Sequence, residues 1–361
     1  MNALNPEICV GNLIEKRQTY TWRWPSATNP VPRDALYRFS EVPEEPSFGD
    51  VAIVRVESIG KYTFVENRTG CQMKIFPGTI MLGVFSTRYA PDEWEALLPE
   101  RVYEGAELHL LNRGGTLGVV TSINSGWGAP TTVKVLAFAR NKNDQIVNTK
   151  DYGIESHDRP PLNETEDPKL ILVVGSSMNA GKSNAAKSVV YSLTAAGYRV
   201  FGGKVTGTAA RRDALLMRAA GALGIIDFTD FGYPSTYLLP EDELNRLFWR
   251  MYNYFRKQAG PDGYIVFEIA DGILQRETAM LLANPDIRKK IHKLVFACSD
   301  PLSALAGVEL LNERYNLDPA AIVGRVANSD LGIRELRSVV DHIPVLNSMV
   351  IDVEGVLDAV A

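Results

Sequence analysis

The chain has few cysteines, no long hydrophobic run and little net charge. Its three cysteines, Cys9, Cys71 and Cys298, lie far apart and form no CxxC pair, which indicates neither a disulfide framework nor a zinc site. No segment approaches the ~18 consecutive apolar residues of a membrane-spanning helix. The N-terminal segment carries acidic residues and is unlike a signal peptide. We therefore expect a cytoplasmic protein that has no membrane partner.

The charge balance argues against a nucleic-acid partner. The net charge is −5, and acidic residues surround the short basic clusters. Proteins that bind nucleic acid through its phosphates need an excess of Lys and Arg on one surface. We therefore expect a small-molecule substrate and no nucleic acid.

The length of 361 residues, with 45% of them apolar, allows two domains. Residues 1–155 begin with an irregular, proline-containing lead-in that we expect to wrap a domain. They continue with short β-branched segments punctuated by Gly, Asn and Pro, which are typical of a barrel- or sandwich-like β-rich domain. One helix is expected to interrupt this domain at Ala90–Leu98, because Asp92 would lie in its acidic first turn.

The C-terminal half has a different pattern. Residues 156–168 are polar and rich in proline, and we interpret them as a linker. In residues 169–361, nearly continuous apolar runs alternate with helical patterns. Strands buried on both faces have this composition, and their alternation with helices indicates a parallel sheet flanked by helices. The predicted fold class of this second domain is therefore α/β.

The segment GSSMNAGKS, Gly175–Ser183, lies between a predicted buried strand and a predicted helix. It matches the phosphate-loop pattern G-x-x-x-x-G-K-[ST] at every specified position. Glycines let the backbone N–H groups curl around phosphate oxygens, and the helix that follows presents its positive dipole end to the anion. The expected nucleotide-binding residues are Gly175, Ser176, Ser177, Met178, Asn179, Ala180, Gly181, Lys182, Ser183 and Asn184.

Two residues of this loop have individual roles in the expected chemistry. Lys182 is expected to neutralise the β and γ phosphates, and the Ser183 hydroxyl is expected to bind Mg²⁺. The sequence therefore predicts that the second domain binds a nucleoside triphosphate together with Mg²⁺.

Charged residues follow the next strands of the predicted sheet. Lys204 ends one apolar run, and Asp213 opens the following helix. The alternative interpretations are a surface lysine and a helix N-terminal charge. Glu268 interrupts another apolar run and Asp271 starts a turn just after it, and either carboxylate could be the second acidic group near Mg²⁺. Asn328 follows a late strand, where its amide could pair with a purine edge or simply form a turn.

These motifs carry a family resemblance. Residues from about 169 to 348 resemble dethiobiotin synthetase and its relatives in the SIMIBI class of P-loop proteins. The matching segments, in order, are GSSMNAGKS, AGYRVFGGKVTGT, RDALLM, GYIVFEIADG and IVGRVANSD. The resemblance implies an ATP-dependent kinase or ligase that phosphorylates a small carboxylate- or amine-bearing metabolite or activates it for amide formation.

The resemblance also implies roles for single residues. Lys182 and Lys204 would be the catalytic lysines that neutralise the transferring phosphoryl group. Ser183, Asp213 and Glu268 would surround Mg²⁺, and Asn328 would contact the adenine of ATP. Relatives of this kind often form homodimers, which the resemblance extends to this chain as an expectation.

This chain departs from the family at several points. Ser177 stands where the family has an acidic residue, the sequence IADG replaces a glycine-rich turn, and the β-rich domain is additional. We therefore expect phosphoryl transfer to a substrate other than the biotin precursor.

The whole chain more loosely resembles a two-domain P-loop group that includes D-amino-acid N-acetyltransferase-like proteins, through RYAPDEWEA at Arg88–Ala96. That resemblance implies an N-acyltransferase with an acyl-CoA-type cofactor as an alternative. A nucleotide-switched regulatory NTPase, with the β-rich domain as its partner module, is the third hypothesis.

Overall fold

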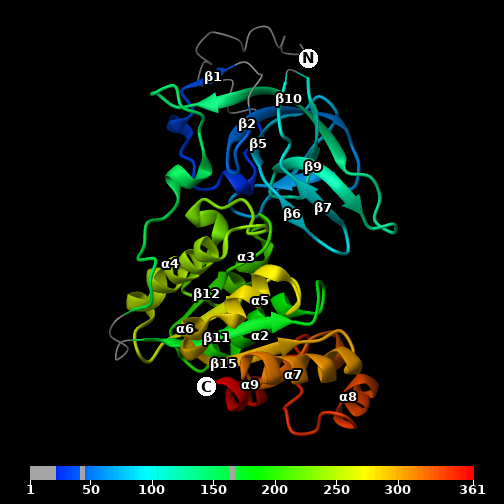
Figure 1. The fold of residues 1–361 in the computed structure, drawn as a ribbon. Helices are drawn as coiled ribbons and strands as arrows, with labels where there is room; N and C mark the ends of the chain where they lie inside the picture. The colour runs from blue at the N-terminus through cyan, green and yellow to red at the C-terminus, as the bar shows by residue number, and fades with distance from the viewer. Residues whose placement is uncertain (1–21, 41–44, 104, 162–166) are drawn as a thin grey trace. The chain divides into compact units, whose positions relative to one another are not determined.

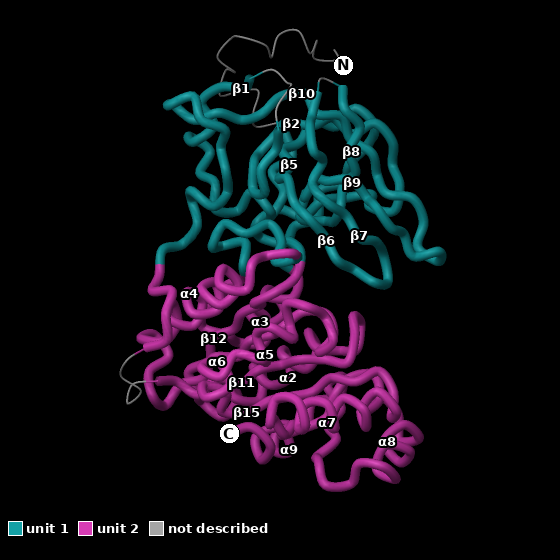
Figure 2. The backbone as a smooth tube through the Cα atoms, viewed as in Figure 1, with its two compact units in different colours: residues 1–155, 208–211, 228–237 teal, residues 156–207, 212–227, 238–361 magenta. Residues whose placement is uncertain are grey.

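The computed structural model describes residues 22–40, 45–103, 105–161 and 167–361. Its contacts divide the chain into two compact units (Figure 2). Unit 1 contains residues 1–155, 208–211 and 228–237, and unit 2 contains residues 156–207, 212–227 and 238–361. Two short segments of the C-terminal half thus belong to unit 1. The expected wrapping by residues 1–21, with Cys9, and the middle of the expected linker lie outside the described residues.

Unit 1 is rich in β-strands, as the sequence predicts. Its strands are β1 (Arg38–Ser40), β2 (Val51–Ser58), β3 (Phe64–Glu66), β4 (Gln72–Lys74), β5 (Ile80–Phe85), β6 (Arg88–Tyr89), β7 (Trp94–Leu97), β8 (Glu107–Leu110), β9 (Thr116–Ile123) and β10 (Thr131–Arg140). Its short 3-10 helices are η2 (Ser26–Thr28), η3 (Arg33–Ala35), η4 (Thr149–Tyr152) and η5 (Phe228–Phe231).

The strand pairing of unit 1 closes on itself. Strands β2, β5, β9, β8 and β10 pair in that order, and β10 pairs again with β2, so they form a small barrel (Figure 1). Only the β5–β9 pairing in this ring is parallel. Alternating residues of β10, such as Val133 and Val135, are fully buried in its core, where Phe85 stacks on Phe138 at 5.3 Å between ring centroids.

The helix predicted at Ala90–Leu98 is wrong. Residues 94–97 form β7, which pairs antiparallel with β9. The Trp94 side chain is buried, and its indole N–H donates to the Leu111 carbonyl at 3.1 Å. Burying this large ring and completing the ladder with β9 outweighs the local helical pattern, because propensity is weak where tertiary contacts are strong.

Unit 2 contains a six-stranded, fully parallel sheet, which confirms the predicted α/β class. Its strands are β11 (Lys169–Gly175), β12 (Val200–Lys204), β13 (Gly224–Asp227), β14 (Tyr264–Glu268), β15 (Ile291–Ala297) and β16 (Ala321–Val323). The strand order is β13-β12-β14-β11-β15-β16. No pattern in the sequence indicates β13, because a four-residue strand carries too little periodicity to be recognised.

Helices cover both faces of this sheet (Figure 1). They are α2 (Lys182–Ala195), α3 (Arg212–Ala219), α4 (Glu241–Ala259), α5 (Arg276–Ala283), α6 (Pro285–Lys290), α7 (Pro301–Tyr315), α8 (Asp330–Arg337) and α9 (Val353–Val360), with the 3-10 helix η6 (Arg325–Asn328). Among the described residues, no helix combines the length and the apolar character that crossing a membrane requires.

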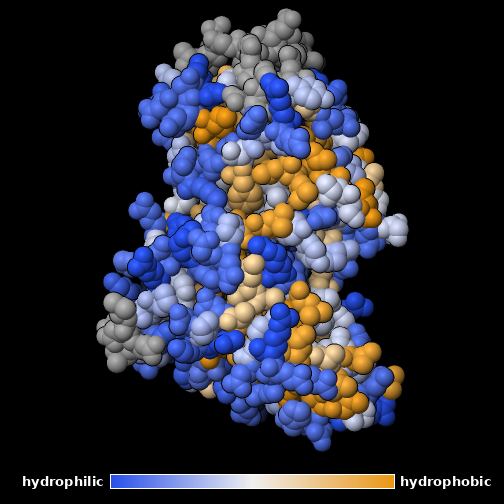
Figure 3. Space-filling view, viewed as in Figure 1, coloured by the Kyte–Doolittle hydropathy of each residue, from blue (hydrophilic) through white to orange (hydrophobic). Residues whose placement is uncertain are grey.

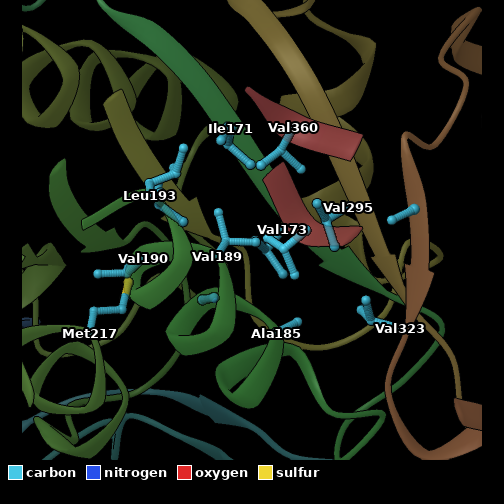
Figure 4. Close-up of a cluster of buried hydrophobic side chains, with 14 of the residues drawn as sticks. Ile171, Val173, Ala185, Val189, Val190, Leu193, Met217, Val295, Val323 and Val360 are labelled. Carbon is cyan, nitrogen blue, oxygen red and sulfur yellow. The ribbon is translucent and has the colours of Figure 1, made fainter. Parts of the chain in front are cut away.

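Alternating residues of each strand point to opposite faces of the sheet and pack against the helices there. On one face, Val173 of β11 and Val295 of β15 pack with Val189 of α2 and Val360 of α9 (Figure 4). On the other face, Phe267 of β14 meets Phe248 of α4, with 5.8 Å between the ring centroids. These two cores hold the strand ends in place, and the strand ends carry the charged residues described below.

Replacing Leu193 with Ala tests the core under α2. Leu193 is fully buried, so we expect the free energy of unfolding of unit 2 to fall by about 2–5 kcal/mol. Tyr191, on the same helix but 46% exposed, is the matched control, and Tyr191→Ala should change stability by less than about 0.5 kcal/mol. Helical circular dichroism during urea unfolding reports on unit 2, because the described α-helices all lie there. Equal losses for both variants would contradict this assignment of the core.

Candidate nucleotide-binding site

The phosphate loop connects β11 to α2, as the sequence predicts. Its backbone is held at both ends: the Ser176 N–H donates to Ala297 O at 2.9 Å, and Ala180 O accepts from the Arg325 N–H at 3.0 Å. Gly181 adopts φ of 115°, and a Cβ there would lie 2.8 Å from the Gly324 Cα. Glycine is therefore required at this position both for its conformation and for the close approach.

Lys182 begins α2 and is buried at the loop. Its side-chain nitrogen donates to Ser177 O at 2.8 Å. Burial lowers the pKa of Lys182, and the nearby Glu268 carboxylate opposes this effect. The Ser177 carbonyl thus holds the ammonium group against the loop, where it can bind an anion.

A cluster of charged side chains forms where β12 and β14 end. Lys204 and Glu268 are register partners on these neighbouring parallel strands, and their side chains come within 3.9 Å. Lys204 also forms an ion pair with Asp213 of α3. The Ser183 hydroxyl of α2 donates to Glu268 Oε1 at 3.0 Å. Because parallel strands place their carboxyl ends at one edge, four residues distant in the sequence meet in one place.

The pKa values in this cluster are shifted in opposite directions. Burial and the neighbouring Asp213 carboxylate raise the pKa of Glu268 to about 7, against the pull of Lys204 and Lys182. Burial also acts to raise the pKa of Asp213, but the Lys204 ammonium outweighs it and holds this pKa below its ordinary value. Burial acts to lower the pKa of Lys204, but the two carboxylates raise it above its ordinary value. Shifts of this kind, in a cleft, are typical of functional sites.

The residues present fit a magnesium ion that is bound with a nucleotide. Glu268 Oε2 is buried and has no hydrogen-bond partner, although burying such an atom is costly. Ser183 supplies a hydroxyl next to it, and oxygen atoms are the ligands that Mg²⁺ prefers. No group of three or more His, Cys, Asp or Glu among the described residues could hold a metal alone. A magnesium ion at this place would take its further ligands from phosphate oxygens or from water.

A cleft of about 320 Å³ lies over these residues, entirely within unit 2. Of the predicted site residues, those that line it are Met178, Asn179, Gly181, Lys182, Ser183, Asn184, Lys204, Asp213 and Glu268. Asp271, the alternative acidic residue, also lines it, so both candidate carboxylates are at the site. Gly175, Ser176, Ser177 and Ala180 belong to the loop but not to the described lining of the cleft.

Asn328 is a further predicted site residue that is not among the described lining residues of this cleft. It ends η6 with an exposed side chain. A backbone hydrogen bond connects η6 to the loop, by the Arg325 N–H that donates to Ala180 O. Its proposed contact with an adenine stays a prediction.

The sequence analysis missed three residues of the cleft: Arg212, Leu216 and Ala270. Arg212 and Leu216 lie on α3 on either side of Asp213. Because they are four residues apart on a helix, they share one face of it and both line the cleft. The signals that pointed to this helix were the neighbouring Asp213 and the segment RDALLM, which contains both residues. Ala270 follows the strand that carries Glu268, and an alanine has no chemistry that a sequence motif could reveal.

The comparisons with known proteins identify no family for this chain. No family model matches the chain, and no curated protein matches it. Two solved structures of the signal recognition particle receptor FtsY from Elizabethkingia anophelis are similar to it at 14% sequence identity. The one in complex with GDP has a TM-score of 0.38 and covers 55% of this chain and 65% of that chain. The other has a TM-score of 0.35 and covers 53% of this chain and 65% of that chain.

The chain thus spans less than two thirds of the length of these FtsY chains, and likeness at this level says nothing of what it binds. Unit 2 has the fold of a P-loop nucleotide-binding domain, which its own strand, loop and helix establish. The finer resemblances, to dethiobiotin synthetase and to D-amino-acid N-acetyltransferases, stay predictions.

The raised pKa of Glu268 predicts a pH-dependent stability. Between its ordinary value of 4.5 and about 7, the folded protein holds a proton that the unfolded chain has lost. The free energy of unfolding of unit 2, without nucleotide, should therefore fall as the pH rises through this window. Glu268→Gln should flatten the fall, as measured by urea unfolding at several pH values. Glu309→Gln, an exposed change on α7, is the control and should keep the wild-type slope. Equal slopes for all three proteins would remove Glu268 from this role.

Proposed function

We propose that unit 2 binds Mg²⁺ and a nucleoside triphosphate in the 320 Å³ cleft and transfers the terminal phosphoryl group. One observation carries the proposal. Two ammonium groups, Lys182 and Lys204, share the cleft with a serine hydroxyl and with Glu268, whose second oxygen lacks a partner. Burying these charges costs free energy, and a neutral ligand would not offset that cost.

Each group has a defined part in this proposal. The N-terminus of α2 and the Lys182 ammonium bind the phosphate tail, because both place positive charge at the loop. Lys204 lines the same cleft, paired with Asp213, and stabilises the charge that builds up on the transferring group. Ser183 and Glu268 would hold Mg²⁺, which supplies electrostatic stabilisation of the phosphate oxygens when bound.

We propose that the acceptor is a small metabolite with a carboxylate or an amine, as in a kinase or an amide-forming ligase. The support is the part of the cleft beyond the phosphate loop, where Arg212 lies with the apolar Leu216 and Ala270. A cation beside apolar side chains suits a small organic anion. The expectation of ATP rests on Asn328, which is outside the described lining, so the tests below include GTP as well.

A second candidate is a nucleotide-switched NTPase whose acceptor is water and whose rate a protein partner controls. It is favoured by large apolar side chains that follow the carboxyl ends of three strands: Leu274 is 71% exposed, Leu302 is 73% exposed and Leu331 is 69% exposed. Figure 3 shows apolar side chains gathered on the surface over α7 and α8. Exposed apolar side chains that gather near a functional cleft are typical of protein-binding surfaces.

Lys182→Ala tests the phosphate-binding role. We expect turnover to fall by about 10²–10³-fold, the usual effect of removing a group that stabilises developing charge. Calorimetric titration with ATP and with GTP, each with and without MgCl₂, measures binding, and release of the nucleoside diphosphate measures turnover. Lys289→Ala, a change at an exposed lysine of α6, is the control and should leave both unchanged. If wild-type protein binds neither nucleotide, the proposal is wrong.

The acceptor is tested by nucleotide turnover in the presence of a metabolite library. Release of diphosphate that depends on one small molecule supports the kinase or ligase. Slow hydrolysis that responds only to a protein fraction supports the regulatory NTPase, and then Leu302→Glu should abolish the response while basal hydrolysis stays unchanged. Release of a thiol from an acyl-CoA without nucleotide turnover would contradict both candidates.

A further inference from the structure

The turn after β14 carries a carboxylate of the cleft to which the proposed function gives no role. Asp271 lines the cleft three residues after Glu268, and the turn and the phosphate loop both lie in unit 2. Its neighbour Ala270 belongs to the part of the cleft where we propose that the acceptor binds. Burial lowers the pKa of Lys182, and the carboxylates of Glu268 and Asp271 oppose this effect. Asp271 is therefore within electrostatic range of the ammonium group at the phosphate loop.

The backbone of Asp271 has a conformation that glycine adopts more easily. Its φ is 60°, in the left-handed region. Aspartate tolerates this region better than most residues do, but its Cβ still costs free energy that glycine would not cost. Residues held in such conformations cluster at active sites, where the structure around them fixes the strained backbone. The question is therefore what fixes this turn and what its carboxylate does there.

Two buried threonines fix the turn on the side of Ala270. The Ala270 N–H donates to the Thr206 hydroxyl at 2.8 Å, and the Thr278 hydroxyl donates to Ala270 O at 3.0 Å. Thr206 is 2% exposed and Thr278 is fully buried. Both backbone polar groups of the residue before Asp271 are thus bonded to side chains that solvent does not reach.

The phosphate loop fixes the other side of the turn. The Ile273 N–H donates to Gly175 O at 2.9 Å. A Cβ on Gly272 would lie 2.4 Å from Ser176 O, so only glycine lets the two backbones approach this closely. Asp271 is therefore held against the start of the phosphate loop by its own neighbours in the chain.

The other acidic residues of the cleft are less suited to accept a proton. Asp213 forms an ion pair with Lys204, and Glu268 accepts from the Ser183 hydroxyl where we propose that Mg²⁺ binds. A carboxylate next to an ammonium group or a metal ion is a weaker base, because the positive charge stabilises its ionised form. Asp271 lies closer in the chain to the acceptor's part of the cleft than either of them.

We infer that Asp271 is the general base of the transfer and that the acceptor attacks through an atom that carries a proton, as an amine or water does. The attacking nitrogen or oxygen forms a bond to the terminal phosphorus of the nucleotide. The bond from this phosphorus to the bridging oxygen breaks, and its electron pair leaves with the nucleoside diphosphate. The proton of the attacking atom passes to the Asp271 carboxylate and from there to water.

This inference rests on the proposed function, because it assigns the proton of the same reaction. It also narrows the acceptor class. A carboxylate that attacks the phosphorus is already ionised near pH 7 and has no proton to give up. The metabolite would therefore react through an amine, and Arg212 would bind whatever anionic group the metabolite carries.

The first test is Asp271→Asn, because asparagine also tolerates a positive φ and keeps the shape of the side chain. Water is the acceptor probe, and release of inorganic phosphate from ATP and from GTP in single-turnover assays is the readout. We expect the rate to fall by about 10²–10⁴-fold, the usual effect of removing a general base. Calorimetric titration of the imido analogues of ATP and GTP with MgCl₂ should show affinities within about threefold of wild type.

The second test is Asp271→Gly, which removes the carboxylate and leaves space for a small one. Glycine suits a φ of 60°, so we expect this variant to unfold at no lower urea concentration than wild type. Added sodium formate should raise its rate of hydrolysis at least about tenfold, because formate can enter the space and accept the proton. Formate should raise the rates of wild type and of Asp271→Asn by less than about twofold.

Asp144 provides a matched control for both substitutions. It has a φ of 66°, so its backbone conformation is that of Asp271, but its side chain is 58% exposed and does not line the cleft. Asp144→Asn and Asp144→Gly should leave hydrolysis, analogue affinity and the response to formate unchanged. Circular dichroism confirms that each variant is folded, and Asp271→Asn decides the matter if Asp271→Gly is not.

The outcomes separate this inference from the proposed function. If wild-type protein binds neither analogue, both are wrong. If it binds an analogue but hydrolyses neither nucleotide above the uncatalysed rate, or if Asp271→Asn hydrolyses at the wild-type rate, Asp271 is not the base and the proposed function can still stand. A tenfold loss of analogue affinity in Asp271→Asn would assign this carboxylate to binding and overturn the inference. Failure of formate to restore turnover in folded Asp271→Gly would overturn it as well.

Discussion

Two ammonium groups and two carboxylates lie together where β12 and β14 end, and the proposed chemistry depends on this cluster. Lys204 and Glu268 are register partners on adjacent strands, so the hydrogen bonding of the sheet itself sets their separation. Lys182 and Ser183 reach the same place from the first turn of α2. A shift of one residue in the β12–β14 register would turn Lys204 or Glu268 to the opposite face of the sheet, and the charged groups would no longer lie together.

Such a cluster does not stabilise the fold efficiently. Removing paired charges from water costs about as much free energy as their mutual attraction contributes. Apolar residues of the same volume would stabilise the fold at least as well. The unpartnered oxygen of Glu268 makes the arrangement still less favourable. Buried groups of this kind are retained where a ligand completes them, which agrees with a cation and a phosphate tail at this cleft.

The division into units does not follow the order of the chain. The P-loop half is not one continuous unit, since residues 208–211 and 228–237 belong to unit 1. These segments contribute a buried alanine, a buried arginine and the carboxylate of Asp230 to that unit. Their contacts lie far away in the sequence, with Glu66 as the clearest case. Neither segment has a composition that marks it as part of a β-rich unit, so no sequence pattern could have assigned it there.

The sequence by itself determined the elements whose signal is local. The phosphate loop follows from the spacing of Gly175, Gly181 and Lys182, and the parallel sheet follows from long apolar runs between helices. The sequence also indicated Lys204 and Glu268 as charged residues within or after apolar strands, but it did not indicate that their side chains contact each other. Only the tertiary structure decided that Trp94 lies in a strand and not in a helix, that Arg212 lines the cleft, and that Asn328 does not. These outcomes depend on strand pairing and burial between residues distant in the chain, and local spacing carries no information about such contacts.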